Sequence, residues 1–117
     1  MYKRQVYDSA FVTDELCELR SQAALSNQAH LDSWVKRFTG PPPQLDDLMP
    51  ALSKATMPAL IIHGRDDRVV SPESSLRLNA VIPNARMLVF NRCGHWAQIE
   101  HAAEFNAVLD NFIALNP

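Results

Sequence analysis

The chain has 117 residues, of which 47% are hydrophobic and 21% are charged, the ordinary proportions of a soluble globular domain. With 11 Lys and Arg against 13 Asp and Glu the net charge is −2, which argues against the basic surface of a protein that binds nucleic acid or an anionic membrane. No apolar run is long enough for a membrane span or a signal peptide, and the 2 cysteines match no metal-binding spacing, so we expect a cytoplasmic protein without metal or cofactor.

The first part of the chain predicts a pair of helices. Thr13 is a suitable N-cap for the first helix, because the acidic pair 14–15 that follows it suits the positive end of the helix dipole. Arg20 lies on this helix, whose apolar face consists of Leu16, Leu19 and Ala23. The second helix ends at Gly40, and its apolar residues are Leu31, Trp34, Val35 and Phe38. The prolines at 41–43 cannot continue a helix and mark the strongest boundary in the chain.

The rest of the chain predicts alternating helices and strands. A short helix near residues 45–52 leads into a first apolar strand at 59–64. Ser71 caps a crossover helix, and a second apolar strand follows at about 86–90. Beyond the loop that contains His95, a final helix is predicted by the spacing of Phe105, Val108, Leu109, Phe112 and Ile113.

Each predicted strand ends in a polar loop. Because two strands joined by a helix lie parallel, their tips meet at one edge of the sheet, and an Asp of the loop at 65–68 can approach His95. An Asp that orients a His supplies two members of a nucleophile, His and acid triad. Neighbouring side chains diverge, so at most one of Asp66 and Asp67 faces His95, and spacing alone does not select between them. Two strands are too few for a parallel sheet, so we expect the C-terminal part of a larger α/β enzyme.

Two motifs resemble those of a known family. The segment 64–72, GRDDRVVSP, resembles the acid loop of the α/β-hydrolase fold. The segment 92–101, RCGHWAQIEH, is similar to the His loop of the meta-cleavage product hydrolases within that fold. The resemblance runs from about Val6 to the C-terminus and implies an α/β fold: the last two parallel strands with flanking helices, preceded by part of a helical lid. It places the partial lid at residues 1–43 and the C-terminal part of the core at 44–117.

The resemblance also implies roles for individual residues. It assigns the triad acid to Asp67 and the triad base to His95, which lie 28 residues apart. Trp96 corresponds to a residue beside the substrate and Arg20 to a lid arginine that helps to ketonise the dienol substrate. A Ser-His-Asp site then hydrolyses a carbon-carbon bond of a 2-hydroxy-6-oxohexa-2,4-dienoate-type compound in aromatic degradation. No G-x-S-x-G motif occurs in the chain, so we expect the nucleophile and the oxyanion loop upstream of Met1.

Alternatives stay open at this point. The fold also hosts ester hydrolysis and dehalogenation, and a truncated chain would be inactive, as we expect for these 117 residues alone. Val69 and Val70 either line an acyl-side pocket or are simply buried. His63 is interpreted as a core histidine with satisfied hydrogen bonds, and Cys93 as a packing residue. A small-molecule substrate is expected, and the full-length protein is a possible homo-oligomer.

Overall fold

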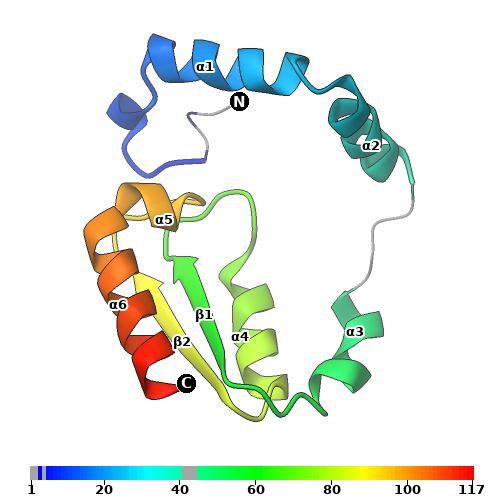
Figure 1. The fold of residues 1–117 in the computed structure, drawn as a ribbon, viewed down its shortest axis with the longest axis vertical. Coiled ribbons are helices and arrows are strands. Elements are labelled where there is room, and N and C mark those ends of the chain that lie inside the picture. Colours follow the sequence, from blue (N-terminus) through cyan, green and yellow to red (C-terminus); the bar gives the residue numbers. More distant parts are fainter. Residues whose placement is uncertain (1–2, 4, 41–44) are drawn as a thin grey trace.

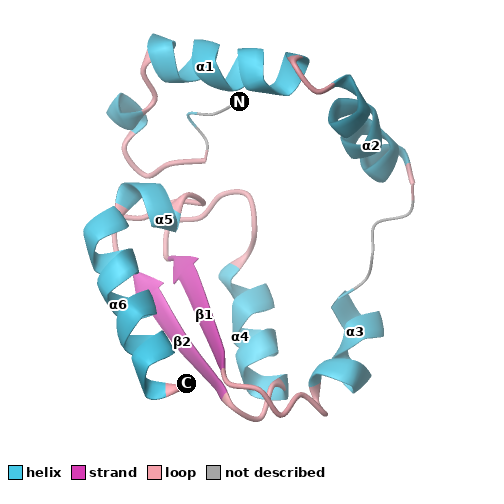
Figure 2. Cartoon of the chain, in the orientation of Figure 1, coloured by secondary structure: helices cyan, strands magenta, loops and turns pink. Residues whose placement is uncertain are grey.

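A computed structural model describes residues 3, 5–40 and 45–117, and the prolines at 41–43 therefore lie outside the described residues. Helices precede, connect and follow two strands, in the order expected (Figures 1 and 2). The elements are a 3-10 turn η2 (Ser9–Phe11), α1 (Asp14–Leu25), α2 (Gln28–Thr39), α3 (Leu45–Leu52), β1 (Ala59–Gly64), α4 (Pro72–Val81), β2 (Ala85–Phe90), α5 (Ala97–Glu100) and α6 (Ala102–Leu115).

Polar side chains fix the starts of the helices as the sequence predicts. The Thr13 hydroxyl accepts a hydrogen bond from the Leu16 amide at 3.1 Å, so α1 begins directly after it. The Ser71 hydroxyl accepts from the Glu73 amide at 3.3 Å, and Pro72 occupies the first turn of α4. Both caps satisfy amides that have no partner inside the helix.

The strands β1 and β2 form a parallel pair in which Ala59 lies opposite Ala85 and Gly64 opposite Phe90. Ile62, Leu88 and Phe105 of α6 pack against the same apolar cluster, whereas His63 bonds to Ser75 of α4. Because successive side chains of a strand point to opposite faces, α4 and α6 cover opposite faces of the sheet (Figure 1). The two strand tips therefore end at one edge between these helices.

Two small apolar clusters pack the segment around Val6 and Val12, and the start of α6, against the loop that contains His95. The first consists of Val6, Val12 and Trp96 with Leu16 and Cys17, and the second of Phe90, Cys93 and Ala97 with Ile62, Leu88 and Phe105. In Figure 1 the segment before α1 passes beside α5, and α1 lies beyond the strand tips. None of the described helices is both long enough and apolar enough to cross a membrane.

Candidate active site

The loops after β1 and β2 interlock through their backbones. The Arg65 amide donates to the Phe90 carbonyl and the Asp66 amide to the Cys93 carbonyl, each at 2.9 Å. A Cβ atom on Gly64 would lie 2.0 Å from the Gly94 carbonyl oxygen, which no side chain could tolerate. Only glycine at position 64 therefore permits this close approach, and the approach brings the two polar loops together.

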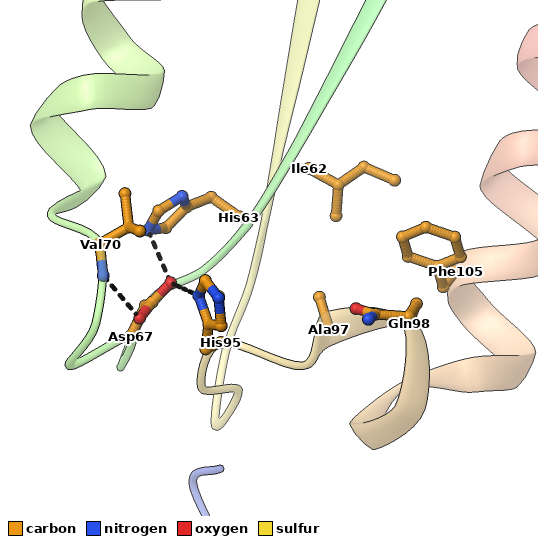
Figure 3. A pocket seen from close by; sticks show the side chains of 9 residues that line it. Ile62, His63, Asp67, Val70, His95, Ala97, Gln98 and Phe105 are labelled. Atoms are coloured by element: carbon orange, nitrogen blue, oxygen red, sulfur yellow. Dashed lines mark hydrogen bonds and ion pairs between the residues drawn. The ribbon is translucent and has the colours of Figure 1, made fainter. Parts of the chain in front are cut away.

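Asp67 and His95 are in direct contact at this edge. Their atoms Oδ2 and Nδ1 are 2.9 Å apart, and the Asp67 side chain is 4% exposed whereas that of His95 is 37% exposed (Figure 3). An ionised carboxylate can only accept hydrogen bonds, so His95 carries its proton on Nδ1 and keeps a lone pair on Nε2. The geometry therefore prepares His95 to act as a base.

Asp67 is held in place by its own loop. Its second oxygen, Oδ1, accepts hydrogen bonds from the amides of Val69 at 2.7 Å and Val70 at 3.1 Å. Burial raises the pKa of Asp67, but the hydrogen bonds from His95 and these two amides, with the charge of His95, lower it by more. The pKa therefore lies below its ordinary value of 3.8, and the carboxylate is ionised at neutral pH.

The neighbouring acid has a different environment. Asp66 Oδ2 lies 3.6 Å from the Nε atom of Arg65 and has no hydrogen-bond partner among the described residues. The amides of Val69 and Val70 bond to Asp67 instead. One carboxylate thus both caps the turn and contacts the histidine.

A cavity of about 180 Å³ opens beside the pair (Figure 3). Its lining residues are Ile62, His63, Gly64, Asp67, Val70, His95, Ala97, Gln98 and Phe105. Of the two alternatives for Val69 and Val70, simple burial does not apply, because they are 52% and 39% exposed. Of the two valines, Val70 lines the cavity. Among the described residues no group of at least three His, Cys, Asp or Glu side chains is placed to hold a metal ion.

The structure places Arg20 next to Trp96. The guanidinium carbon of Arg20, on α1, lies 4.7 Å from the centre of the Trp96 ring, a distance typical of a cation-π contact. Trp96 directly follows His95 and is 6% exposed. A cation from the N-terminal helices is therefore held beside the His loop.

Cys93 has no thiolate to offer near this site. Its side chain is fully buried, and burial, followed by the negative charges of Glu100, Asp66 and Asp67, raises its pKa to about 11. A thiol with this pKa is protonated at neutral pH and is a poor nucleophile, in agreement with the packing role expected from the sequence.

Two further residues belong to the site although the sequence did not single them out for it. His63 is 6% exposed; its Nδ1 lies 2.8 Å from the Ser75 hydroxyl, and its Nε2 lies 3.7 Å from Asp67 Oδ2. This Nε2 has no hydrogen-bond partner among the described residues, so the prediction of a fully satisfied core histidine is wrong. The four-residue step from His63 to Asp67 carries no signal, because it runs from a strand into a loop and not along a helix.

Glu100 is the second such residue. Its carboxylate accepts hydrogen bonds from the Gly94 amide at 2.9 Å and from the Tyr7 amide at 2.6 Å. Both partners are backbone groups, and Tyr7 is 93 positions away in the sequence. No pattern of residue types therefore predicts these contacts.

A buried acid bonded to a histidine at adjacent strand tips is the arrangement of two members of a nucleophile, His and acid triad. Residues 12–102 match the family model described as the alpha/beta hydrolase fold. The chain belongs to this family, and the expected fold class is confirmed.

Within the family, the similar proteins include meta-cleavage product hydrolases. A 2-hydroxy-6-oxononadienedioate/2-hydroxy-6-oxononatrienedioate hydrolase of Cupriavidus pinatubonensis is 46% identical over 108 residues, which are 92% of this chain and 37% of the relative. Its counterpart from Paraburkholderia xenovorans is 43% identical over 109 residues, or 93% of this chain and 38% of the relative. The solved meta-cleavage product hydrolase CumD of Pseudomonas fluorescens IP01, as its S103A mutant, has a TM-score of 0.81 and 36% identity, over 97% of this chain and 43% of that one.

The chain thus spans 37–38% of the length of the curated relatives it matches, and the matched region is their C-terminal part. The resemblance seen in the two loop motifs is confirmed by these matches.

Proposed function

We propose that residues 1–117 act as the C-terminal part of a serine-type hydrolase that cleaves carbon-carbon bonds of 2-hydroxy-6-oxohexa-2,4-dienoate-type compounds. The observation that carries this proposal is the 2.9 Å contact between Asp67 and His95 at adjacent strand tips. Residues 1–43 contribute part of the lid, and residues 44–117 contribute the acid and the base of the core.

His95 is the general base in this proposal. Its Nε2 takes the proton of a serine hydroxyl supplied by the preceding part of the full-length protein, and the serine oxygen then bonds to the substrate carbonyl carbon. Asp67 stabilises the imidazolium that forms, because its carboxylate already accepts the proton on Nδ1. His95 returns the proton as the carbon-carbon bond breaks, and hydrolysis of the acyl-enzyme by water completes the formation of two acids.

Arg20 and Trp96 supply the preference for a dienoate. Cleavage is feasible only after the dienol has been converted to a keto form, because the carbon that leaves then departs as a stabilised enolate. A cation near the substrate carboxylate and dienolate stabilises the negative charge that develops during ketonisation. The position of Arg20 beside Trp96, next to the base, supports this role and favours the dienoate over the esters or haloalkanes that other members of the fold hydrolyse.

The remaining expectations form part of the same proposal. The substrate is a small molecule that reaches the cavity beside His95, lined in part by Val70, while Val69 contributes to the acyl side of the pocket. The protein acts in the cytoplasm, without nucleic acid or membrane partners, and the full-length form is a possible homo-oligomer.

The test uses the full-length protein that carries this segment. Release of the two acid products from the dienoate, abolished in His95→Ala, is the expected result, with esters and haloalkanes turned over far more slowly under the same conditions. Turnover of an ester or haloalkane with no turnover of the dienoate would contradict the proposal and would indicate ester hydrolysis or dehalogenation instead.

A further inference from the structure

We propose that Glu100 is a positioning residue that fixes the loop containing His95 relative to the segment 5–7, which precedes α1. This inference rests on the proposed function, because it concerns the two steps assigned to His95 and Arg20. Glu100 touches neither substrate nor reacting atoms, and it acts through the backbone that carries them.

Glu100 forms a bridge between two segments of the backbone. It is the last residue of α5, the short helix that follows the His loop. One carboxylate oxygen accepts from the Gly94 amide at 2.9 Å, directly before His95, and the other accepts from the Tyr7 amide at 2.6 Å. A single ionised side chain therefore joins two segments that are far apart in the sequence, and hydrogen bonds to an ionised acceptor are the stronger kind.

The bridge supports a backbone contact between the same two segments. The His95 amide donates to the Gln5 carbonyl at 2.6 Å, so the base itself is tied to the N-terminal segment. A Cβ atom on Gly94 would lie 2.7 Å from the Gln5 carbonyl oxygen and 2.8 Å from Val6, so the two backbones touch without space for a side chain. Val6 is 2% exposed and packs with Trp96, so apolar packing adds to the backbone contact.

These contacts of Glu100 and of the His95 amide lie between His95 and Arg20. On one side, the His loop sets the position of the His95 ring against Asp67. On the other side, the segment 5–7 leads through η2 into α1, which places Arg20 over the Trp96 ring. Both groups therefore depend on the pair of hydrogen bonds that Glu100 accepts.

The nature of the side chain follows from its two donors. The Gly94 and Tyr7 amides each donate to a different oxygen of Glu100. Among side chains, only a carboxylate offers two acceptor oxygens in this way. In Glu100→Gln one end becomes an NH₂ group that cannot accept, so one bond remains, whereas Glu100→Ala removes both. Glu104 is a matched control, since it is an exposed acid whose recorded ion-pair contact is with His101 at 3.6 Å.

Rapid-mixing, single-turnover absorbance on the full-length enzyme separates ketonisation from cleavage. Glu100→Ala is expected to lower both rate constants by roughly 10 to 100-fold, the scale of a misplacement of about 1 Å, with Glu100→Gln in between and Glu104→Ala at the wild-type rates. Loss of folded enzyme would lower the amplitudes and leave the rate constants unchanged, so a merely stabilising role gives a different result.

A second measurement does not depend on substrate. The proton between His95 Nδ1 and Asp67 should give a low-field NMR signal in the wild type, weakened or shifted in Glu100→Ala and retained in Glu104→Ala. A wild-type enzyme that does not turn over the dienoate would refute the proposed function. An active wild type with unchanged rate constants and an unchanged proton signal in Glu100→Ala would refute the role of Glu100 alone.

Discussion

The carboxylate of Asp67 contacts several groups of the site. It accepts hydrogen bonds from His95, Val69 and Val70, and it also lies 3.7 Å from His63 Nε2. The loop amides fix the carboxylate, and the fixed carboxylate in turn fixes the ring of His95. Its ionised state is therefore a structural requirement and, in the proposed mechanism, a catalytic one.

Replacing Asp67 by Asn should keep the fold but impair the base. The amide group can present its NH₂ to the ring, which favours the tautomer with the proton on Nε2, so His95 can no longer accept a proton there. We expect cleavage to slow on the order of thousands-fold in the full-length enzyme, by analogy with other triads, measured as the single-turnover rate constant. A rate within tenfold of the wild type would contradict the role of Asp67 as the orienting acid.

The lowered pKa of Asp67 predicts a defined pH dependence of stability. The unfolded chain binds the proton near the ordinary pKa of 3.8, before the folded protein does. The stabilisation is therefore fully present above about pH 3.8 and is lost as the pH falls through the lower folded value. Urea unfolding across this range should show a decline in the wild type that is smaller in Asp67→Asn, and equal declines would show that the pKa is not lowered.

At the scale of elements, the loops after β1 and β2 pack against each other through their backbones, with no side chain at Gly64 between them. Gly64→Ala should force these loops apart, because its Cβ would lie 2.0 Å from the Gly94 carbonyl oxygen. We expect a loss of about 1–3 kcal/mol in the free energy of unfolding, the usual scale of overpacking, measured by urea denaturation. The control is Gly40→Ala, where the nearest atom is 3.5 Å away. Equal stability of the two variants would argue against tight loop packing.

Much of this arrangement follows from local patterns in the sequence. Apolar runs, helical spacing and the caps Thr13 and Ser71 predict the helices and strands, because those signals are confined to a few neighbouring residues. The meeting of an Asp with His95 follows from parallel topology alone. The choice of Asp67 over Asp66 needed the family resemblance, since neighbouring residues in a turn carry no signal of direction.

Other parts of the site could not be predicted because they depend on distant backbone. The bridge from Glu100 to Tyr7 joins amide and carboxylate across most of the chain, and backbone donors have no sequence signature. The proximity of His63 to Asp67 depends on the direction in which the loop leaves β1. Valine is usually buried, but the exposure of Val69 and Val70 depends on which elements pack over their loop.

At the scale of the whole molecule, the chain leaves much apolar surface uncovered. Exposed large hydrophobic residues occur on α1, α2, α6, strand β2 and the loop after β1, including Leu19, Leu25, Trp34, Val35, Val69, Val89 and Ile113. The two-stranded sheet also has open edges, and such edges pair readily with other chains. We therefore expect the 117-residue chain alone to be poorly soluble or oligomeric in size-exclusion chromatography. A monodisperse monomer with a cooperative melt would contradict this.

The central claim is that base and lid cation serve different steps of one reaction in the full-length enzyme. The direct measurement is rapid-mixing absorbance with a dienol substrate, comparing Arg20→Ala and His95→Ala with the wild type. We predict that Arg20→Ala slows ketonisation, because the cation no longer stabilises the developing dienolate charge, and that His95→Ala forms the keto intermediate but fails to cleave it. Ketonisation at the wild-type rate in Arg20→Ala, or normal cleavage in His95→Ala, would contradict the account.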